Sequence, residues 1–238
     1  MITDKRSEIV FIVTGAAGMI LTLMMEILTP LDVHLQDLFY DISRKEWIVD
    51  GEAVGPRFWF YNFPKIILFG FGFLLFLRVL DFKMIGRALP FSPREALYIL
   101  ICLAGIPLLV GLGKNITRVH CPSELRRYGG TEEYRRVISS EEKTSNQVRP
   151  HCFPAGHASG GFALFAFYFA RRRRAWFAVP MTYGWAMGMY QILKGAHFLS
   201  HTLFTMFFAL FFAAVLAPLF FPRQPQTQRQ ESLRDSVA

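Results

Sequence analysis

The sequence predicts an all-α membrane protein with six transmembrane helices. Of its 238 residues, 53% are hydrophobic and 16% are aromatic, which is unusual for a soluble domain of this length. A helix needs about 20 mostly apolar residues to span the hydrocarbon core of a bilayer. Six segments reach or approach this length, and they are 9–29, 58–80, 96–113, 154–170, 175–194 and 198–221.

The first segment predicts a retained span, because it is too long for a cleavable signal peptide and no small-residue cleavage site follows it. Glu26 and Lys65 lie near segment ends, where long side chains can reach the interface. Residues 1–221 are expected to form one membrane domain. Residues 222–238 are polar and rich in Gln and Arg, which is typical of a disordered tail.

The distribution of basic residues favours a cytoplasmic location for both termini. Short loops weigh most in this rule, and two short basic loops, 83–94 and 171–174, fall inside in this orientation. The loops 30–57 and 114–153 then lie outside. The net charge of +8 comes from residues that flank apolar segments, so it predicts contact with anionic lipid and no nucleic-acid partner.

The first outer loop contains DVHLQDLFYD, residues 32–41. Its apolar positions predict a short interfacial helix on the membrane surface, with a packing role.

Three polar clusters are expected to reach the same outer face. Ionisable groups at membrane depth are candidates for function. The clusters consist of Lys114 and Arg118 after the third segment, His157 at the mouth of the fourth, and Gln191, Lys194, His197 and His201 between the fifth and sixth. Members of the last cluster are three, three and four residues apart, so they would share one stripe if the segment were a continuous helix.

These residue types suit a phosphate group. Cations and amide donors bind an anion such as phosphate. Gly156, Gly160 and Gly161 would let backbone amides approach an anion at the start of a helix. One imidazole can attack phosphorus while another protonates the leaving oxygen.

The order and spacing of these residues resemble the type 2 phosphatidic acid phosphatase (PAP2) superfamily. The family motifs are Lys, six residues, Arg-Pro; then Pro-Ser-Gly-His; then Ser-Arg, five residues, His, three residues, Asp. The corresponding stretches here run from Lys114 to Pro122, from Pro154 to His157 and from Tyr190 to His201. The stretch GAHFLSH, 195–201, also resembles the third motif of bacterial lipid A phosphatases.

The resemblance implies a mechanism and a location. His197 matches the histidine that attacks phosphorus to form a phosphohistidine, and His157 matches the one that protonates the leaving group. Lys114 matches the first phosphate ligand. The expected protein is a bacterial inner-membrane hydrolase with its active site facing the periplasm and with no cofactor.

The three stretches differ from the family pattern at several motif positions. Cys121 and Gln191 replace arginines, Ala155 replaces the serine, and His201 replaces the aspartate that orients the nucleophile. Arg118 and Lys194 could restore positive charge. A neutral His201 could accept a hydrogen bond from His197, and Glu124 could supply a carboxylate from across the site.

Cys121 and Cys152 both fall in the outer loop and are 31 positions apart. In an oxidising periplasm a disulfide between them is expected, worth about 3–4 kcal/mol in the chain-entropy model. A metal site is the weaker reading. His197 and His201 have the spacing of a helical metal pair but lack the Glu of the zinc-protease motif, and other candidate ligands such as His120 and His151 are scattered.

The leading hypothesis is therefore a membrane phosphatase of a lipid phosphate or diphosphate, with membrane lipids as its partners. Candidate substrates are lipid A, undecaprenyl diphosphate and a phosphoglycerolipid. Two alternatives remain open. One is a lipid phosphotransferase that uses the same intermediate, and the other is a non-catalytic lipid-binding or transport protein.

Overall fold

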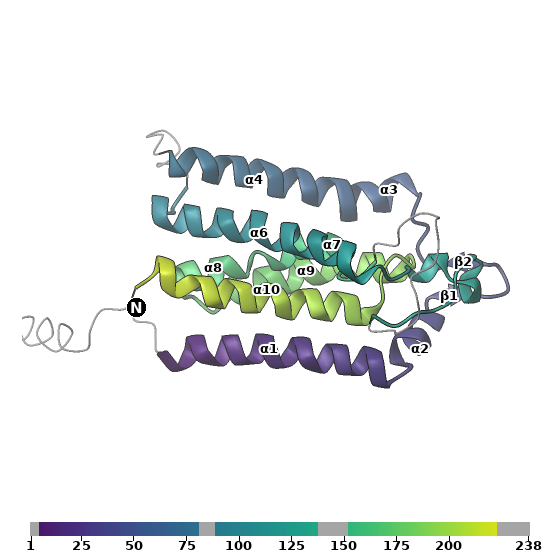
Figure 1. Cartoon of the computed structure of the whole chain (residues 1–238). Helices are drawn as coiled ribbons and strands as arrows, with labels where there is room; N and C mark the ends of the chain where they lie inside the picture. Colours follow the sequence, from purple (N-terminus) through teal and green to yellow (C-terminus); the bar gives the residue numbers. More distant parts are fainter. Residues whose placement is uncertain (1–4, 81–88, 138–151, 223–238) are drawn as a thin grey trace, which may run out of the picture.

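The fold was analysed in a computed structural model, which describes residues 5–80, 89–137 and 152–222. It is a bundle of long helices with a small polar headpiece at one end (Figure 1). The first half of the described chain contains α1 (Lys5–Leu28), α2 (Leu31–Asp37), β1 (Tyr40–Asp41), β2 (Glu46–Trp47), α3 (Val54–Arg57), the π-helical turn η1 (Phe58–Asn62) and α4 (Phe63–Val79). The second half contains α6 (Pro93–Thr117), the 3-10 turns η2 (Pro122–Glu124) and η3 (Arg126–Tyr128), α7 (Gly156–Phe162), α8 (Phe165–Arg171), α9 (Ala175–Leu193) and α10 (Leu199–Phe220).

The helices pack in antiparallel neighbours along the bundle. α1 packs along α10, α4 packs along α6, and α7 and α8 both pack against α9. Many apolar side chains of α1 and α4 are exposed, among them Ile20 and Phe69. Such exposure is what a lipid environment allows, because lipid tails are as apolar as the side chains.

Four described helical segments are long and apolar enough to cross a membrane, and they are Ser7–Leu28, Val54–Val79, Pro93–Glu124 and Leu199–Phe220. They correspond to the expected segments 9–29, 58–80, 96–113 and 198–221. The expected fourth segment is not one long helix, because a turn at 163–164 separates α7 from α8. α9 covers the fifth. The helical fold is confirmed, whereas the count of six spans stays a prediction.

Ion pairs fix the end of the bundle that lies opposite the headpiece. The basic turn 171–174 follows α8 there. Arg172 Nη2 donates to Glu8 Oε1 at 2.6 Å, and Glu8 is only 1% exposed. Arg171 Nη1 lies 3.3 Å from Glu95 Oε1. Because a buried carboxylate is costly without a partner, these arginines tie α8 to the starts of α1 and α6.

The headpiece is formed by α2, the β1–β2 hairpin and η3. Tyr40, Trp47 and Tyr128 pack their rings against one another, with centroids 4.8–5.4 Å apart. Arg127 donates two hydrogen bonds to Asp37, at 2.7 and 2.6 Å. This guanidinium holds the pKa of the Asp37 carboxyl below its usual value. The hairpin and η3 therefore form one polar and aromatic unit above the bundle.

The expected helix within 32–41 is present as α2, but it buries polar side chains. Asp32 is 3% exposed and Gln36 is 1% exposed. Gln36 Nε2 donates to the Ile192 carbonyl at 2.8 Å, and this hydrogen bond ties α2 to the end of α9. The predicted tail, 222–238, lies outside the described residues except for Pro222.

Candidate active site

Three segments that are distant in the sequence meet at the headpiece end of the bundle. Lys114 lies in the last turn of α6, and His157 is the second residue of α7. His197 lies in the turn between α9 and α10. These positions are at the same end of the helices, next to α2 and the hairpin (Figure 1). The predicted convergence of the three clusters is therefore present in the fold.

Backbone hydrogen bonds join the three loops to one another. Cys152 N–H donates to the Val119 carbonyl at 3.0 Å, Ser123 N–H to the Gly195 carbonyl at 2.8 Å, and Ala155 N–H to Thr205 Oγ1 at 2.9 Å. The first bond links the first motif to the second, the next links the first to the third, and the last links the second to α10. Each loop is thus positioned by the other two.

A disulfide joins Cys121 to Cys152, with Cα atoms 5.1 Å apart. Cys121 ends the first motif, and Cys152 stands just before the second. The remaining cysteine, Cys102, is free and buried within α6. The disulfide closes the loop of 31 positions and fixes the exit of α6 against the entry of α7.

The turn between α9 and α10 depends on Gly195. Its φ is +73°, which favours glycine, and a Cβ there would overlap the ring of Trp47 in β2. The helix therefore stops at Leu193. The condition for one shared stripe, a continuous helix from Gln191 to His201, is not met. The turn carries the residues inward instead, so they still gather in one place.

Asp32, which is remote in the sequence, caps the N-terminus of α10. The N-cap residue of α10, Phe198, has no side chain that can cap the helix. Asp32 Oδ1 accepts a hydrogen bond from Ser200 N–H at 2.9 Å and so takes this role. Burial raises the pKa of the Asp32 carboxyl above its usual value. α2 thereby fixes the first turn of α10, where His201 lies.

The three candidate catalytic histidines lie close together. The ring centroids of His157 and His197 are 5.8 Å apart, and those of His197 and His201 are 5.9 Å apart. His197 and His201 are 2% and 1% exposed, whereas His157 is half-buried. Burial lowers the pKa of His197 well below its usual value, and the charge of Lys114 adds to the effect. His197 is therefore a neutral imidazole near pH 7.

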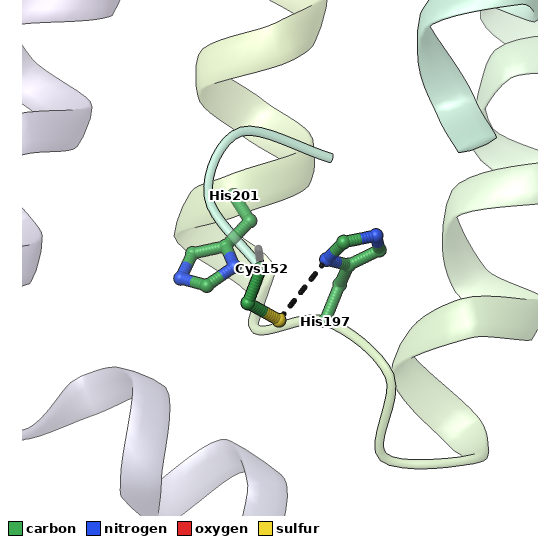
Figure 2. A group of neighbouring side chains, drawn as sticks. All are labelled: Cys152, His197 and His201. Carbon is green, nitrogen blue, oxygen red and sulfur yellow. Dashed lines mark hydrogen bonds between the residues drawn. The ribbon is translucent and has the colours of Figure 1, made fainter. Parts of the chain in front are cut away.

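Figure 2 shows Cys152 between the rings of His197 and His201. The Cys152 Sγ atom lies 3.4 Å from His197 Nδ1. Donor atoms of the three residues all lie within 4.8 Å of one another, a separation that suits a metal ion. The disulfide removes the thiolate that such an ion would need, so this donor set offers two imidazoles.

Lys65, expected only to reach the interface from a segment end, lies at the site. Lys65 Nζ lies 3.7 Å from the centre of the Tyr61 ring, and this ring lies 4.9 Å from that of His157. Lys194 Nζ lies 5.9 Å from the same tyrosine ring. Tyr61 therefore gathers two lysines beside His157 through cation–π contacts. A charged residue inside an apolar run was the available signal, but it also fits a snorkelling side chain.

A pocket of about 570 Å³ opens at this cluster. Lys65, Lys114 and His157 line its polar end, while side chains such as Phe69 and Leu103 line the rest, between α4 and α6. A Cβ at position 156 would lie 3.1 Å from Lys114 Nζ, so the glycine there lets this lysine approach the start of α7. The pocket combines cations with an apolar wall.

The other expected site residues differ in their burial and in their hydrogen-bond partners. Both polar atoms of the Gln191 side chain are buried and have no hydrogen-bond partner within the described residues. Arg118 is exposed at the end of α6, where its Nε donates to the Asn115 carbonyl at 3.4 Å. Glu124, the suggested carboxylate, places its Oε2 3.0 Å from His120 Nδ1.

The other two glycines of α7, Gly160 and Gly161, lie against neighbouring helices. A Cβ at Gly161 would lie 2.7 Å from the Gly184 Cα atom, and one at Gly160 would lie 3.0 Å from the side chain of Leu68. These glycines allow α7 to approach α9 and α4 closely. Their function is helix packing, and the candidate histidine at the start of α7 depends on it.

Comparison with known proteins identifies one family. A family model described as "PAP2 superfamily" matches residues 95–225, which include all three histidines. Searches of curated proteins and of solved structures give no match. The family match covers the site from α6 to α10, whereas α1 to α4, with Lys65 and Tyr61, precede it.

We expect Gly195→Ala to lower the stability of the protein by about 1–3 kcal/mol, because an alanine there meets both a disfavoured φ and the Trp47 ring. Thermal unfolding in detergent measures this. Gly55→Ala is the control, since nothing lies within 4 Å of a Cβ at that position. Equal melting temperatures for the two variants would contradict the role assigned to the turn.

Proposed function

The chain belongs to the PAP2 superfamily, and we propose that it hydrolyses the phosphate or diphosphate group of a membrane lipid. Members of this family are phosphatases, which supports hydrolase activity in general. One observation carries the proposal to this chain. His157 and Lys114 line the polar end of an otherwise apolar pocket, and the ring centroid of His197 lies 5.8 Å from that of His157.

His197 is the proposed nucleophile. It is neutral and buried, so a ring nitrogen has a free lone pair. Attack on phosphorus forms a P–N bond as the P–O bond to the lipid breaks. His157 donates a proton to the departing oxygen. Water then attacks the phosphohistidine, His157 accepts the proton of that water, and phosphate leaves with both histidines restored.

The charges around His157 connect substrate binding to proton donation. Burial is the larger effect that disfavours a protonated imidazole at His157, and the charges of Lys114, Lys65 and Lys194 add to it. Such cations disfavour a protonated imidazole in the empty site. A bound phosphate anion offsets their charge, so the substrate itself would favour the protonated form of His157 that donates to the leaving group.

Positive charge from lysines is proposed to replace that of the missing family arginines. Lys114 and Lys65 line the pocket from α6 and α4, and Lys194 approaches from the end of α9. The buried amide of Gln191 has donors free to bind a phosphate oxygen. Gly156 makes room for Lys114. Arg118, which is exposed, would contribute at longer range to the headgroup.

The pocket indicates a lipid as the substrate. Its wall between α4 and α6 is mainly apolar and suits an acyl or prenyl chain, while the phosphate lies at the lysines. In the proposed topology the bundle crosses the bacterial inner membrane six times with both termini in the cytoplasm. The site then faces the periplasm at headgroup depth, where lipid A, undecaprenyl diphosphate and phosphoglycerolipids carry their phosphates.

The two alternatives lead to different products. A phosphotransferase would pass the phosphoryl group of His197 to a second lipid and release little phosphate. A lipid-binding protein would bind the headgroup without turnover. The convergence of two histidines with ring centroids 5.8 Å apart beside a lysine favours chemistry over binding alone.

We expect the purified protein in detergent to release phosphate from at least one lipid in a panel of lipid phosphates and diphosphates, and to do so in the presence of EDTA. His197→Ala should lower kcat at least about a thousandfold, because the nucleophile is lost. His34→Ala is the matched control, since His34 is exposed on α2. Phosphate release that survives in His197→Ala, or that EDTA abolishes, would contradict the mechanism.

We expect Lys65→Met to raise KM about tenfold or more for the preferred lipid, because one phosphate-binding cation is lost. Its helix should remain intact, since methionine keeps the length and apolar stem of lysine. Lys45→Met removes an exposed lysine of the hairpin turn and serves as the control. Unchanged kinetics in Lys65→Met would show that this lysine does not bind the substrate.

A further inference from the structure

The contact between the disulfide and the nucleophile gives the site a feature of its own. His197 Nδ1 lies 3.4 Å from Cys152 Sγ, and both residues are at most 2% exposed. A disulfide sulfur has no proton, so in this contact it can only accept. In a hydrogen bond to this sulfur, the Nδ1 atom would carry the hydrogen, and Nε2 would keep the lone pair for the proposed attack on phosphorus.

We propose that the Cys121–Cys152 disulfide positions His197, with Cys152 Sγ accepting the Nδ1–H hydrogen bond that an aspartate accepts in the family pattern. The catalytic part of this inference rests on the proposed function. Cys152 is a positioning residue here, because it acts through His197 and does not touch the substrate.

The residue at the motif position itself does not fill this role. His201 replaces the aspartate, and its ring centroid is 5.9 Å from that of His197. The Nδ1 atom of His201 is buried and has no hydrogen-bond partner within the described part of the chain. Figure 2 shows the Cys152 sulfur between the two rings, and this sulfur lies 3.4 Å from His197 Nδ1. The sulfur therefore contacts His197 Nδ1, and the backbone of Cys152 also hydrogen-bonds to this imidazole.

Two departures from the family pattern then have one explanation. Cys121 occupies the position of the first-motif arginine, and its disulfide holds Cys152 beside the nucleophile. The loss of the arginine and the loss of the aspartate are therefore linked by a single covalent bond. A neutral sulfur stabilises a charged imidazolium less than a carboxylate does, so its contribution is orientation and tautomer.

Two single substitutions separate this role from a purely structural one. Cys121→Ala and Cys152→Ala both remove the disulfide, but only Cys152→Ala also removes the sulfur at His197. We expect Cys152→Ala to have a kcat at least about tenfold below that of Cys121→Ala, with similar KM. Cys102→Ala, which changes the free buried cysteine of α6, should leave kcat unchanged.

A double variant tests rescue by another acceptor. In the Cys121→Ala background, Cys152→Ser provides a hydroxyl oxygen near His197 Nδ1, whereas Cys152→Ala provides none. We expect the serine variant to recover part of the lost kcat. The proposal would be overturned if the two double variants had equal kcat and the two single variants also had equal kcat. The disulfide would then have a structural role only.

A spectroscopic readout keeps the test independent of turnover. The ¹⁵N shifts of labelled histidines report which ring nitrogen carries the proton. The wild type should show His197 protonated at Nδ1, and Cys152→Ala should lose this preference. A wild type protonated at Nε2 would overturn the proposal. A wild type protonated at Nδ1 that hydrolyses no lipid phosphate would contradict the proposed function and leave the positioning inference intact.

Discussion

The Cys121–Cys152 disulfide is the constraint on which the rest of the site depends. It joins the exit of α6 to the entry of α7, and the backbone bond from Cys152 to Val119 reinforces the same junction. Lys114 and His157 lie at the ends of two different helices, and this junction holds those ends together. Because the sulfur also contacts His197, the same bond reaches the third loop. One covalent link thus relates all three segments.

The headpiece also positions the segments around His197. Asp32 caps α10, and Trp47 packs against the Gly195 turn, so α2 and the hairpin fix both sides of His197. These contacts bury His197, the proposed nucleophile, and keep it neutral. The lysines lie instead at the mouth of the pocket, where a phosphate would enter. Burial of the nucleophile and partial exposure of the cations are consistent with an anionic headgroup that arrives from the bilayer surface.

Much of the fold and part of the site follow from the sequence. Long apolar runs predict the long helices, and the order of Lys114, His157 and His197 predicts that three loops meet. The turn at Gly195 lies in the gap between the expected segments 175–194 and 198–221, but only the packed Trp47 shows why the chain turns there. Lys65 and Tyr61 were missed because no local pattern states which helix packs beside α6. The contact of Cys152 with His197 was missed for a similar reason, because it depends on how the entry of α7 packs against the turn between α9 and α10.

The most direct test of the central claim is to trap the covalent intermediate. The protein would be quenched during turnover of a lipid phosphate labelled with ³²P in the phosphoryl group, and the label located by peptide mapping. The account predicts a base-stable, acid-labile phosphoramidate on the peptide containing His197. It also predicts that the label is absent from His197→Ala. Turnover with no labelled histidine, or with the label on another residue, would contradict it.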